Sequence, residues 1–175
     1  MPARQRIGKK TIFNLLGPHT NPCNAKRQIL GVYDKGLLKT FGNVSNLLKM
    51  HHVLVVHGND GLDEISITDK TFVTELKDGN LNQFEIQPED FGLSRANITA
   101  LKAETPEESL ELINAAFEGK ESPVQDMISL NAGASLYLSS ASNSIKDGVN
   151  LAKELLNNGK AKQTFSSYIE MTNSL

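Results

Sequence analysis

The stretch RQILGVYDKGLLKTFGNVSNLLKMHHVLVVHG, residues 27–58, contains the pattern that decides the fold. Residues 27–33 and residues 53–57 are short apolar runs bounded by turn residues, and both are typical of buried β-strands. Between them, large apolar residues recur every three or four positions, as on one face of a helix. These residues are Leu37, Leu38, Phe41, Val44, Leu47 and Leu48. A strand, a helix and a second strand predict a βαβ unit with parallel strands and a right-handed crossover.

A β-hairpin is predicted further along the chain. Residues 71–76 and 81–86 alternate in character, and the KDGN segment at 77–80 supplies the residue types of a tight turn. We therefore expect two antiparallel strands to follow the βαβ unit.

The second half of the chain has helical patterns. Thr105 as N-cap, Pro106 at the first helical position and Glu108 as capping-box partner predict a helix that ends near Gly119. Its expected inward face is Leu110, Ile113 and Phe117. Apolar and small residues at helical spacing predict a second helix over residues 126–140.

Ser144 is the predicted N-cap of a third helix that ends near Gly159, and an amphipathic helix is expected to fill the remainder. The expected inward residues of the third helix are Val149, Ala152, Leu155 and Leu156. Together these elements predict an α/β fold, a parallel sheet flanked by helices, with a β-hairpin.

Composition excludes several classes of protein. The 175 residues are 39% hydrophobic and 22% charged with a formal net charge of -2, so there is no basic footprint for nucleic acid. No apolar run approaches the roughly 20 residues that span a bilayer, so neither a membrane protein nor a secreted one is expected. The lone Cys23 can form no internal disulfide or zinc site. We expect a cytoplasmic protein.

The segment HGNDGLDE, residues 57–64, follows the second predicted strand. Ligands of α/β sheets bind at the carboxyl ends of parallel strands. Asp60, Asp63 and Glu64 offer the hard oxygen donors that Mg²⁺ takes from a protein when substrate phosphates supply the rest of its shell. A solvated acidic loop is the alternative interpretation, and His57 could be only the last core residue of the strand.

Residues 11–22, TIFNLLGPHTNP, combine an apolar turn with Gly-Pro and Thr-Asn-Pro punctuation. This pattern is typical of a helix or turn that breaks into an exposed loop, or of a rigid corner in which proline fixes φ. Lys26 and Arg27 follow, and basic residues before a strand are usually solvated.

The order and spacing of these motifs closely resemble the anthranilate phosphoribosyltransferase family. The resemblance begins near residue 4 and covers nearly the whole chain, although His19 stands where many members have an aliphatic residue. The motifs that carry it are TIFNLLGP-x-TNP at 11–22, AKRQ-x-LGVYD at 25–34, LVVHG-x-DGLDE-x-S at 54–66, LKDG at 76–79, PEDFGL at 88–93 and LNA-x-ASLY at 130–137.

The resemblance implies a nucleoside phosphorylase/phosphoribosyltransferase-like fold and transfer of the phosphoribosyl group from phosphoribosyl pyrophosphate to anthranilate, in tryptophan biosynthesis. By the same resemblance, Arg4 pairs with the carboxylate of anthranilate, and Gly17 and Pro18 contact that substrate. Asp63 and Glu64 match the acidic pair that binds the magnesium ions of the donor. No residue is implied as a catalytic nucleophile, because the aromatic amine attacks the donor directly.

The resemblance also implies an incomplete enzyme. Residues 1–175 would be a partial C-terminal α/β domain, about two-thirds of the family's length. The family's glycine-rich phosphate loop is absent, as is the helical domain through which the enzyme forms a homodimer. Neither GxGxxG nor GxxxxGK occurs in the sequence. The chain alone is therefore expected to be inactive.

Two alternative functions compete with this one. A non-catalytic binding relative of the same fold would be expected to lose Arg4 or the Asp63 and Glu64 pair and to gain basic charge. A pyrimidine nucleoside phosphorylase-like enzyme would not be expected to carry the TIFNLLGP and DGLDE motifs.

Overall fold

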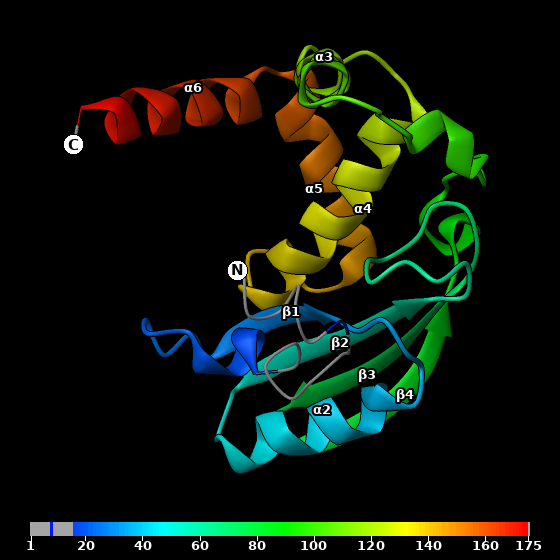
Figure 1. Cartoon of the computed structure of the whole chain (residues 1–175), viewed down its shortest axis with the longest axis vertical. Coiled ribbons are helices and arrows are strands. Elements are labelled where there is room, and N and C mark those ends of the chain that lie inside the picture. Colours follow the sequence, from blue (N-terminus) through cyan, green and yellow to red (C-terminus); the bar gives the residue numbers. More distant parts are fainter. Residues whose placement is uncertain (1–7, 9–15, 175) are drawn as a thin grey trace.

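The computed structural model describes residues 8 and 16–174. A four-stranded sheet has helix α2 against one face and helices α3 to α6 on the other side (Figure 1). The strands are β1 (Arg27–Gly31), β2 (His52–Gly58), β3 (Thr71–Lys77) and β4 (Asn80–Ile86). The helices are α2 (Leu37–Leu47), α3 (Pro106–Phe117), α4 (Pro123–Leu138), α5 (Ile145–Asn157) and α6 (Lys160–Asn173). Short 3-10 helices are η2 (Gly17–Thr20), η3 (Pro88–Phe91) and η4 (Ile98–Leu101).

The predicted βαβ unit is confirmed. Strands β1 and β2 pair in parallel, with Arg27 opposite His52, and α2 connects them. Strand β3 pairs antiparallel with β2, and β4 pairs antiparallel with β3, so the sheet is mixed and its order is β1-β2-β3-β4. The parallel arrangement that we expected is thus confined to one pair. Residues 59–70 join β2 to β3 without a crossover helix, so the chain returns in the opposite direction.

The predicted hairpin is confirmed at its expected position. Lys77 pairs with Asn80, and the two residues between them, Asp78 and Gly79, have φ values of 49° and 81°. Two consecutive positive φ values are the requirement of the tight hairpin turn, and Asp-Gly is a favoured sequence for it.

Strand β2 is buried on both faces. Its Val53 and Val55 belong to one apolar cluster with residues of α2, while Leu54 and Val56 belong to a second cluster with residues of α4 and α5. Alternate side chains of a strand point to opposite faces, so a strand covered on both sides is apolar throughout. This explains the continuous VLVV run at the centre of the sequence pattern.

The predicted N-caps Thr105 and Ser144 are observed, and Ser122, which was not predicted, caps α4 in the same way. The side chains of Thr105, Ser122 and Ser144 each accept a hydrogen bond from the backbone N–H three residues further on, as N-caps do. The Glu108 carboxylate accepts from the N–H of Glu104, not from that of Thr105, so the capping box is shifted by one residue. Helix α4 begins at Pro123, before the predicted start at residue 126.

The predicted inward face of α3 is partly wrong. Leu110 is 50% exposed, while Ala116 is the fully buried residue of this helix. Helix α3 lies at the end of the helical layer (Figure 1), where it has few neighbours to cover a large side chain. The predicted inward face of α5 is confirmed for Val149, Ala152 and Leu156, which are buried, while Leu155 is only half-buried.

Lys26 and Arg27 have structural partners and are not merely solvated. The Lys26 ammonium donates to the carbonyl of Leu48 at the end of α2, and the Arg27 guanidinium donates to the carbonyl of Leu138 at the end of α4. Cations near the carboxyl end of a helix donate hydrogen bonds to its free carbonyls and interact favourably with the negative end of the helix dipole. The start of β1 therefore ties together helices from both sides of the sheet.

Helices α4 and α5 cross at two glycines. A Cβ atom added to Gly133 would lie 2.4 Å from the backbone nitrogen of Val149, and one added to Gly148 would lie 2.2 Å from the carbonyl oxygen of Gly133. Only glycine permits this approach, so the two backbones are in direct contact. No helix in the described part of the chain is long and apolar enough to cross a membrane.

Candidate functional site

The acidic loop, residues 58–66, begins at the last residue of β2. It lies against the end of β1, because a Cβ atom added to Gly31 would stand 1.7 Å from the carbonyl oxygen of Asp63. A Cβ atom added to Gly58 would stand 2.4 Å from a carboxylate oxygen of Asp60. Glycines at the carboxyl ends of both parallel strands thus allow the loop to fold over the edge of the sheet, as expected for a ligand loop.

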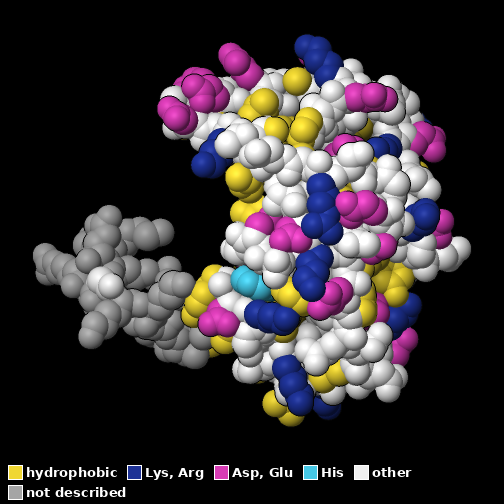
Figure 2. Space-filling model, turned by 90° about the vertical axis from the view of Figure 1, so that its right-hand side faces the viewer, with side chains coloured by type: hydrophobic (Ala, Val, Ile, Leu, Met, Phe, Trp, Pro, Cys, Tyr) yellow, Lys and Arg dark blue, Asp and Glu magenta, His cyan; other side chains and the backbone are white. Residues whose placement is uncertain are grey.

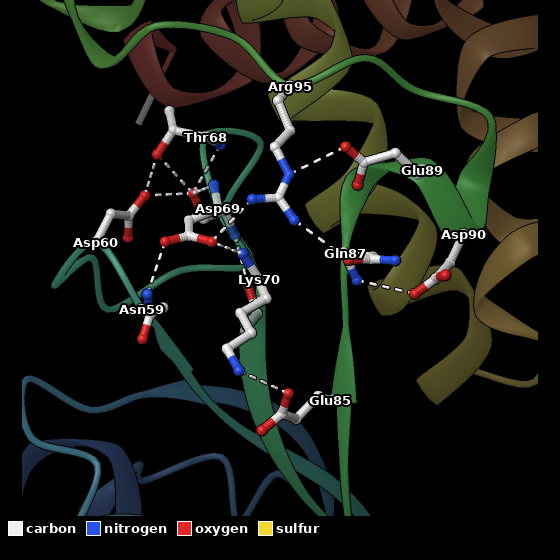
Figure 3. A network of polar contacts seen from close by, with 12 residues as sticks. Asn59, Asp60, Thr68, Asp69, Lys70, Glu85, Gln87, Glu89, Asp90 and Arg95 are labelled. Atoms are coloured by element: carbon white, nitrogen blue, oxygen red, sulfur yellow. Dashed lines mark hydrogen bonds and ion pairs between the residues drawn. The ribbon is translucent and has the colours of Figure 1, made fainter.

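The carboxylate of Asp60 is hydrogen-bonded to residues 62–68 of the same connection. It accepts a hydrogen bond from the hydroxyl of Thr68 (Figure 3). It also accepts from the hydroxyl of Ser66 and from the N–H of Leu62, the latter at 3.2 Å. Partial burial by itself raises the pKa of Asp60, but these hydrogen bonds outweigh it and hold the pKa below its usual value. Asp60 therefore shapes the loop and has little capacity left for a ligand.

The segment that returns to β3 is held by a second polar network (Figure 3). Arg95 donates to Asp69 at 3.0 Å, to Glu89 at 3.0 Å and to Gln87 at 3.2 Å. The amide of Asn59 donates to Asp69 at 2.6 Å, and this hydrogen bond is the main reason that the pKa of Asp69 lies below its usual value. The network links both ends of the 59–70 connection to η3.

Asp63 and Glu64 differ from their acidic neighbours. Neither carboxylate makes a hydrogen bond or ion pair with any residue that the structure describes, and both residues are exposed. Desolvation raises the pKa of Glu64, and the adjacent Asp63 charge raises it further. Two like charges without a cation favour protonation, and a bound cation would relieve that repulsion. This pair is therefore suited to hold a divalent metal ion.

The pair is not a complete metal site by itself. Among the residues that the structure describes, no group of three or more His, Cys, Asp or Glu side chains is arranged to hold a metal ion. Mg²⁺ requires six oxygen ligands in near-octahedral geometry, so two carboxylates leave most of the shell to water and to substrate oxygens. The oxygen donor set and the open position of the loop fit such a shared ion.

His57 is hydrogen-bonded to the backbone of Val32, the residue that follows β1. Its Nδ1 lies 2.7 Å from the carbonyl oxygen of Val32, so Nδ1 carries the proton and donates. The residue is half-buried at the end of β2. Its position supports the simpler of the two interpretations, a structural residue that closes the strand pair.

Gly17 and Pro18 lie in η2, which contacts α2 and not the acidic loop. The adjacent His19 packs against the ring of Phe41, with centroids 5.1 Å apart, and its Nε2 is 3.1 Å from the hydroxyl of Ser45. Figure 1 places this blue segment at the opposite end of the sheet from the loop after β2. The described structure therefore does not bring Gly17 and Pro18 together with the acidic pair, and Arg4 lies outside the described residues.

Charge is mixed on the face where the loop lies. Figure 2 shows Lys and Arg side chains interspersed with Asp and Glu, with no broad region of one sign. The mixed charge of this face agrees with the near-neutral composition.

Two residues that matter for the loop were not selected from the sequence. Gly31 appeared only as part of the LGVYD motif, and Asn131 only as a member of a helical pattern. Asn131 forms hydrogen bonds to the backbone of Ile65, the residue after Glu64. The only signal in the sequence for Asn131 was its polar amide, which stands among apolar residues and residues with small side chains on the same helix face.

The sequence model described as the glycosyl transferase family, a/b domain, matches residues 1–162, so the chain belongs to this family. Within this family, the chain is similar to anthranilate phosphoribosyltransferases. The chain is 44% identical over 171 residues to the anthranilate phosphoribosyltransferase of Methanobrevibacter smithii, which covers 98% of this chain and 51% of the relative. It is 42% identical over 171 residues to that of Hydrogenovibrio crunogenus, with 98% of this chain and 50% of the relative covered.

Solved structures agree with these relatives. The anthranilate phosphoribosyltransferase of Thermus thermophilus superposes with a TM-score of 0.88 at 36% identity, covering 97% of this chain and 50% of that one. The Saccharomyces cerevisiae enzyme in complex with PRPP and Mg gives 0.87 at 29% identity, covering 98% and 50%. The chain thus spans about half the length of the curated relatives it matches, less than the two-thirds that we expected.

Proposed function

We propose that this chain is part of a protein that transfers the phosphoribosyl group of PRPP to anthranilate. The observation that carries the proposal is the Asp63 and Glu64 pair, which has no partner among the described residues. The pair follows a parallel strand at its carboxyl end, in a chain of the glycosyl transferase family. The relatives carry this activity in their name, and the yeast enzyme has been solved with PRPP and Mg and with 4-fluoroanthranilate. The activity is proposed for the whole protein, because this chain spans only half the length of those relatives.

Asp63 and Glu64 would hold magnesium together with the donor's phosphates. Magnesium, when bound, stabilises the negative charge of the pyrophosphate leaving group. The chain's own contribution is to present two carboxylates at one place on a loop that is closely packed on β1. Because free magnesium would find only these two protein ligands, we expect it to bind weakly without the donor.

The acceptor is proposed to be held by Arg4, with contacts from Gly17 and Pro18. An arginine forms a planar, bidentate pair with a carboxylate, which would orient the ring of anthranilate. The bond from the anomeric carbon to pyrophosphate breaks, the amine nitrogen forms the new bond to that carbon, and the amine releases a proton. No covalent intermediate with the protein is needed, so we assign no nucleophile.

The remaining proposals come from the family resemblance. The whole enzyme would be a homodimer formed through a helical domain and would work in the cytoplasm on small-molecule substrates, without nucleic acid or membrane. The formal net charge of -2 and the mixed charge on the face shown in Figure 2 support the exclusion of nucleic acid.

The proposal is tested by metal binding that depends on the donor. Uptake of Mn²⁺, a spectroscopic substitute for Mg²⁺, is measured by electron paramagnetic resonance with and without PRPP. We expect PRPP to promote uptake by the unmodified chain, and Asp63→Ala with Glu64→Ala to weaken it by about tenfold or more.

The matched control is Glu107→Ala with Glu121→Ala, which removes the same charge from exposed positions outside the loop. Its Mn²⁺ uptake should equal that of the unmodified chain. Equal uptake by the Asp63 and Glu64 variant would contradict the proposed function.

A further inference from the structure

The backbone immediately after the acidic pair is held by a side chain from α4. The N–H of Ile65 donates to Oδ1 of Asn131 at 3.0 Å, and Nδ2 of Asn131 donates to the carbonyl oxygen of Ile65 at 2.9 Å. One amide therefore satisfies both backbone groups of the residue that follows Glu64. It does what a neighbouring strand would do, at a place where the sheet supplies none.

The orientation of the Asn131 amide is fixed by a third contact. Its Nδ2 also donates to the carbonyl oxygen of Met127, 3.1 Å away and one turn earlier in α4. A reversed amide would point N–H groups at the N–H of Ile65 and its oxygen at the carbonyl oxygens of Ile65 and Met127. The three contacts together allow only one orientation, so the amide is a rigid connection from helix to loop.

Helix α4 is a firm base for this connection. Leu130 and Ala134, on either side of Asn131, are fully buried, and Gly133 is in backbone contact with α5. A side chain on a packed helix is placed more accurately than one on a loop. The position of Ile65 is therefore determined by helix packing at a distance of 66 residues along the chain.

The acidic loop is consequently anchored on both sides of the pair. Asp60, before the pair, accepts hydrogen bonds from the hydroxyls of Ser66 and Thr68, after it, and Asn131 holds Ile65, which directly follows the pair. Asp63 and Glu64 repel each other, and an unanchored loop would let them move apart. The anchors oppose that movement and keep the backbone of the pair beside the end of β1.

We infer that Asn131 is a positioning residue for the acidic pair, acting through the backbone of Ile65. The inference rests on the proposed function, since the pair it positions is the proposed magnesium site. Partners that orient metal ligands from outside the coordination shell typically contribute about 10- to 100-fold to metal affinity. Asn131 would contribute in that way without touching metal or substrate.

The test uses two independent measurements on the ¹⁵N-labelled chain. Asn131→Leu, nearly the same size as asparagine, removes all three hydrogen bonds, and Asn131→Ala is the second variant if the leucine variant does not fold. The matched control is Gln125→Leu, which removes another amide of α4, one that donates to Asn157 and does not contact the loop.

The first measurement is hydrogen exchange of backbone amides, which requires no ligand. We expect the Ile65 amide to exchange about tenfold faster in the Asn131 variant, while the central amides of β2 stay protected. The Gln125 variant should leave the Ile65 amide unchanged. If Ile65 exchanges equally in all three proteins, the positioning inference is overturned, whatever the outcome with metal.

The second measurement is binding of Mn²⁺ in the presence of pyrophosphate, followed by paramagnetic broadening of the Asp63 and Glu64 amide signals. The Asn131 variant should bind about tenfold more weakly than the Gln125 variant. Equal binding by these two variants would overturn the inference and leave the proposed function intact. An unmodified chain without any broadening at Asp63 and Glu64 would count against the proposed function, while faster exchange at Ile65 would still support the anchoring role of Asn131.

Discussion

Gly31 is a single residue on which the placement of the acidic loop depends. It ends β1, and the Asp63 carbonyl occupies the space where any other residue would carry its Cβ atom. A methyl group there must displace the loop or the strand. Overpacking of this kind costs about 1–3 kcal/mol.

We therefore predict that Gly31→Ala lowers the free energy of unfolding by about 1–3 kcal/mol, because the loop must move away from β1. Urea denaturation followed by circular dichroism gives the value. Gly17→Ala is the control for stability, because an added Cβ atom there meets nothing within 4 Å. An equal effect of the two substitutions would show that Gly31 is not in close contact with the loop.

Asp60 is the residue whose charge state supports the shape of the loop. Its pKa in the folded chain lies below the usual value of 3.8, so it contributes stability at pH values above 3.8, and this contribution disappears as the pH falls through the lower, folded pKa. Asparagine in its place presents an amide N–H₂ to hydroxyl donors.

We predict that Asp60→Asn is less stable than the unmodified chain at neutral pH, and that the difference shrinks as the pH falls below 3.8. Urea midpoints of the two proteins across this pH range provide the measurement. A difference that stays constant over the whole range would mean that the ionised carboxylate is not what holds Ser66 and Thr68.

At the scale of elements, the α4 and α5 pair connects the helical layer to the site. The helices approach each other through Gly133 and Gly148, and α4 carries Asn131 two residues before the first of these glycines. A second connection lies at the far end of α4, where the Tyr137 hydroxyl donates to Glu75 on β3 at 2.9 Å. His52 also contacts that carboxylate at 2.7 Å, and its side chain is only 4% exposed.

We predict that Gly148→Ala destabilises the fold by about 1–3 kcal/mol, although alanine favours a helix by about 1 kcal/mol relative to glycine. The added methyl group would push α5 away from α4. The control is Asn150→Ala on the exposed side of α5, which should be neutral or slightly stabilising. The midpoint of thermal unfolding is measured for the unmodified chain, Gly148→Ala and Asn150→Ala. A higher midpoint for Gly148→Ala than for the unmodified chain would contradict the tight crossing.

At the scale of the whole molecule, the described chain has surfaces without partners. Strand β1 is an edge strand that pairs only with β2 among the described residues, and α6 has no buried residue in the described structure. Helix α6 extends away from the rest of the helical layer (Figure 1), with Tyr168 and Met171 both 59% exposed. Unpaired strand edges and apolar patches favour association with other chains.

We predict that the 175-residue polypeptide alone does not transfer phosphoribosyl groups, even with PRPP, anthranilate and magnesium at saturation. The chain has an acidic pair but none of the glycine-rich phosphate motifs, so it can hold the donor only through the metal ion and does not fix it in line with the acceptor. A donor that is not held in line loses an effective molarity on the order of 10⁵ M. Product formation is measured by loss of anthranilate fluorescence. Turnover by a preparation shown by mass to contain only these residues would require a donor site outside the acidic loop.

The sequence by itself determined the local elements and the position of the acidic pair. The continuous VLVV run, the helical spacing between residues 37 and 48, the Asp-Gly turn and the Thr105 and Ser144 caps all act through neighbours a few residues away, so their patterns can be read directly. The family motifs likewise placed Asp63 and Glu64 at the end of a strand. These predictions depend on short-range geometry, which the order of residues encodes.

Only the tertiary structure decided which long-range contacts support those elements. It joined β3 antiparallel to β2, exposed Leu110, and brought Asn131 to Ile65 across 66 positions. It also showed that Gly31 is required by the Asp63 carbonyl, while Gly17 and Pro18 lie in η2, whose His19 contacts α2. Such contacts depend on how whole elements pack in three dimensions, and spacing along a single sequence contains no direct record of that packing.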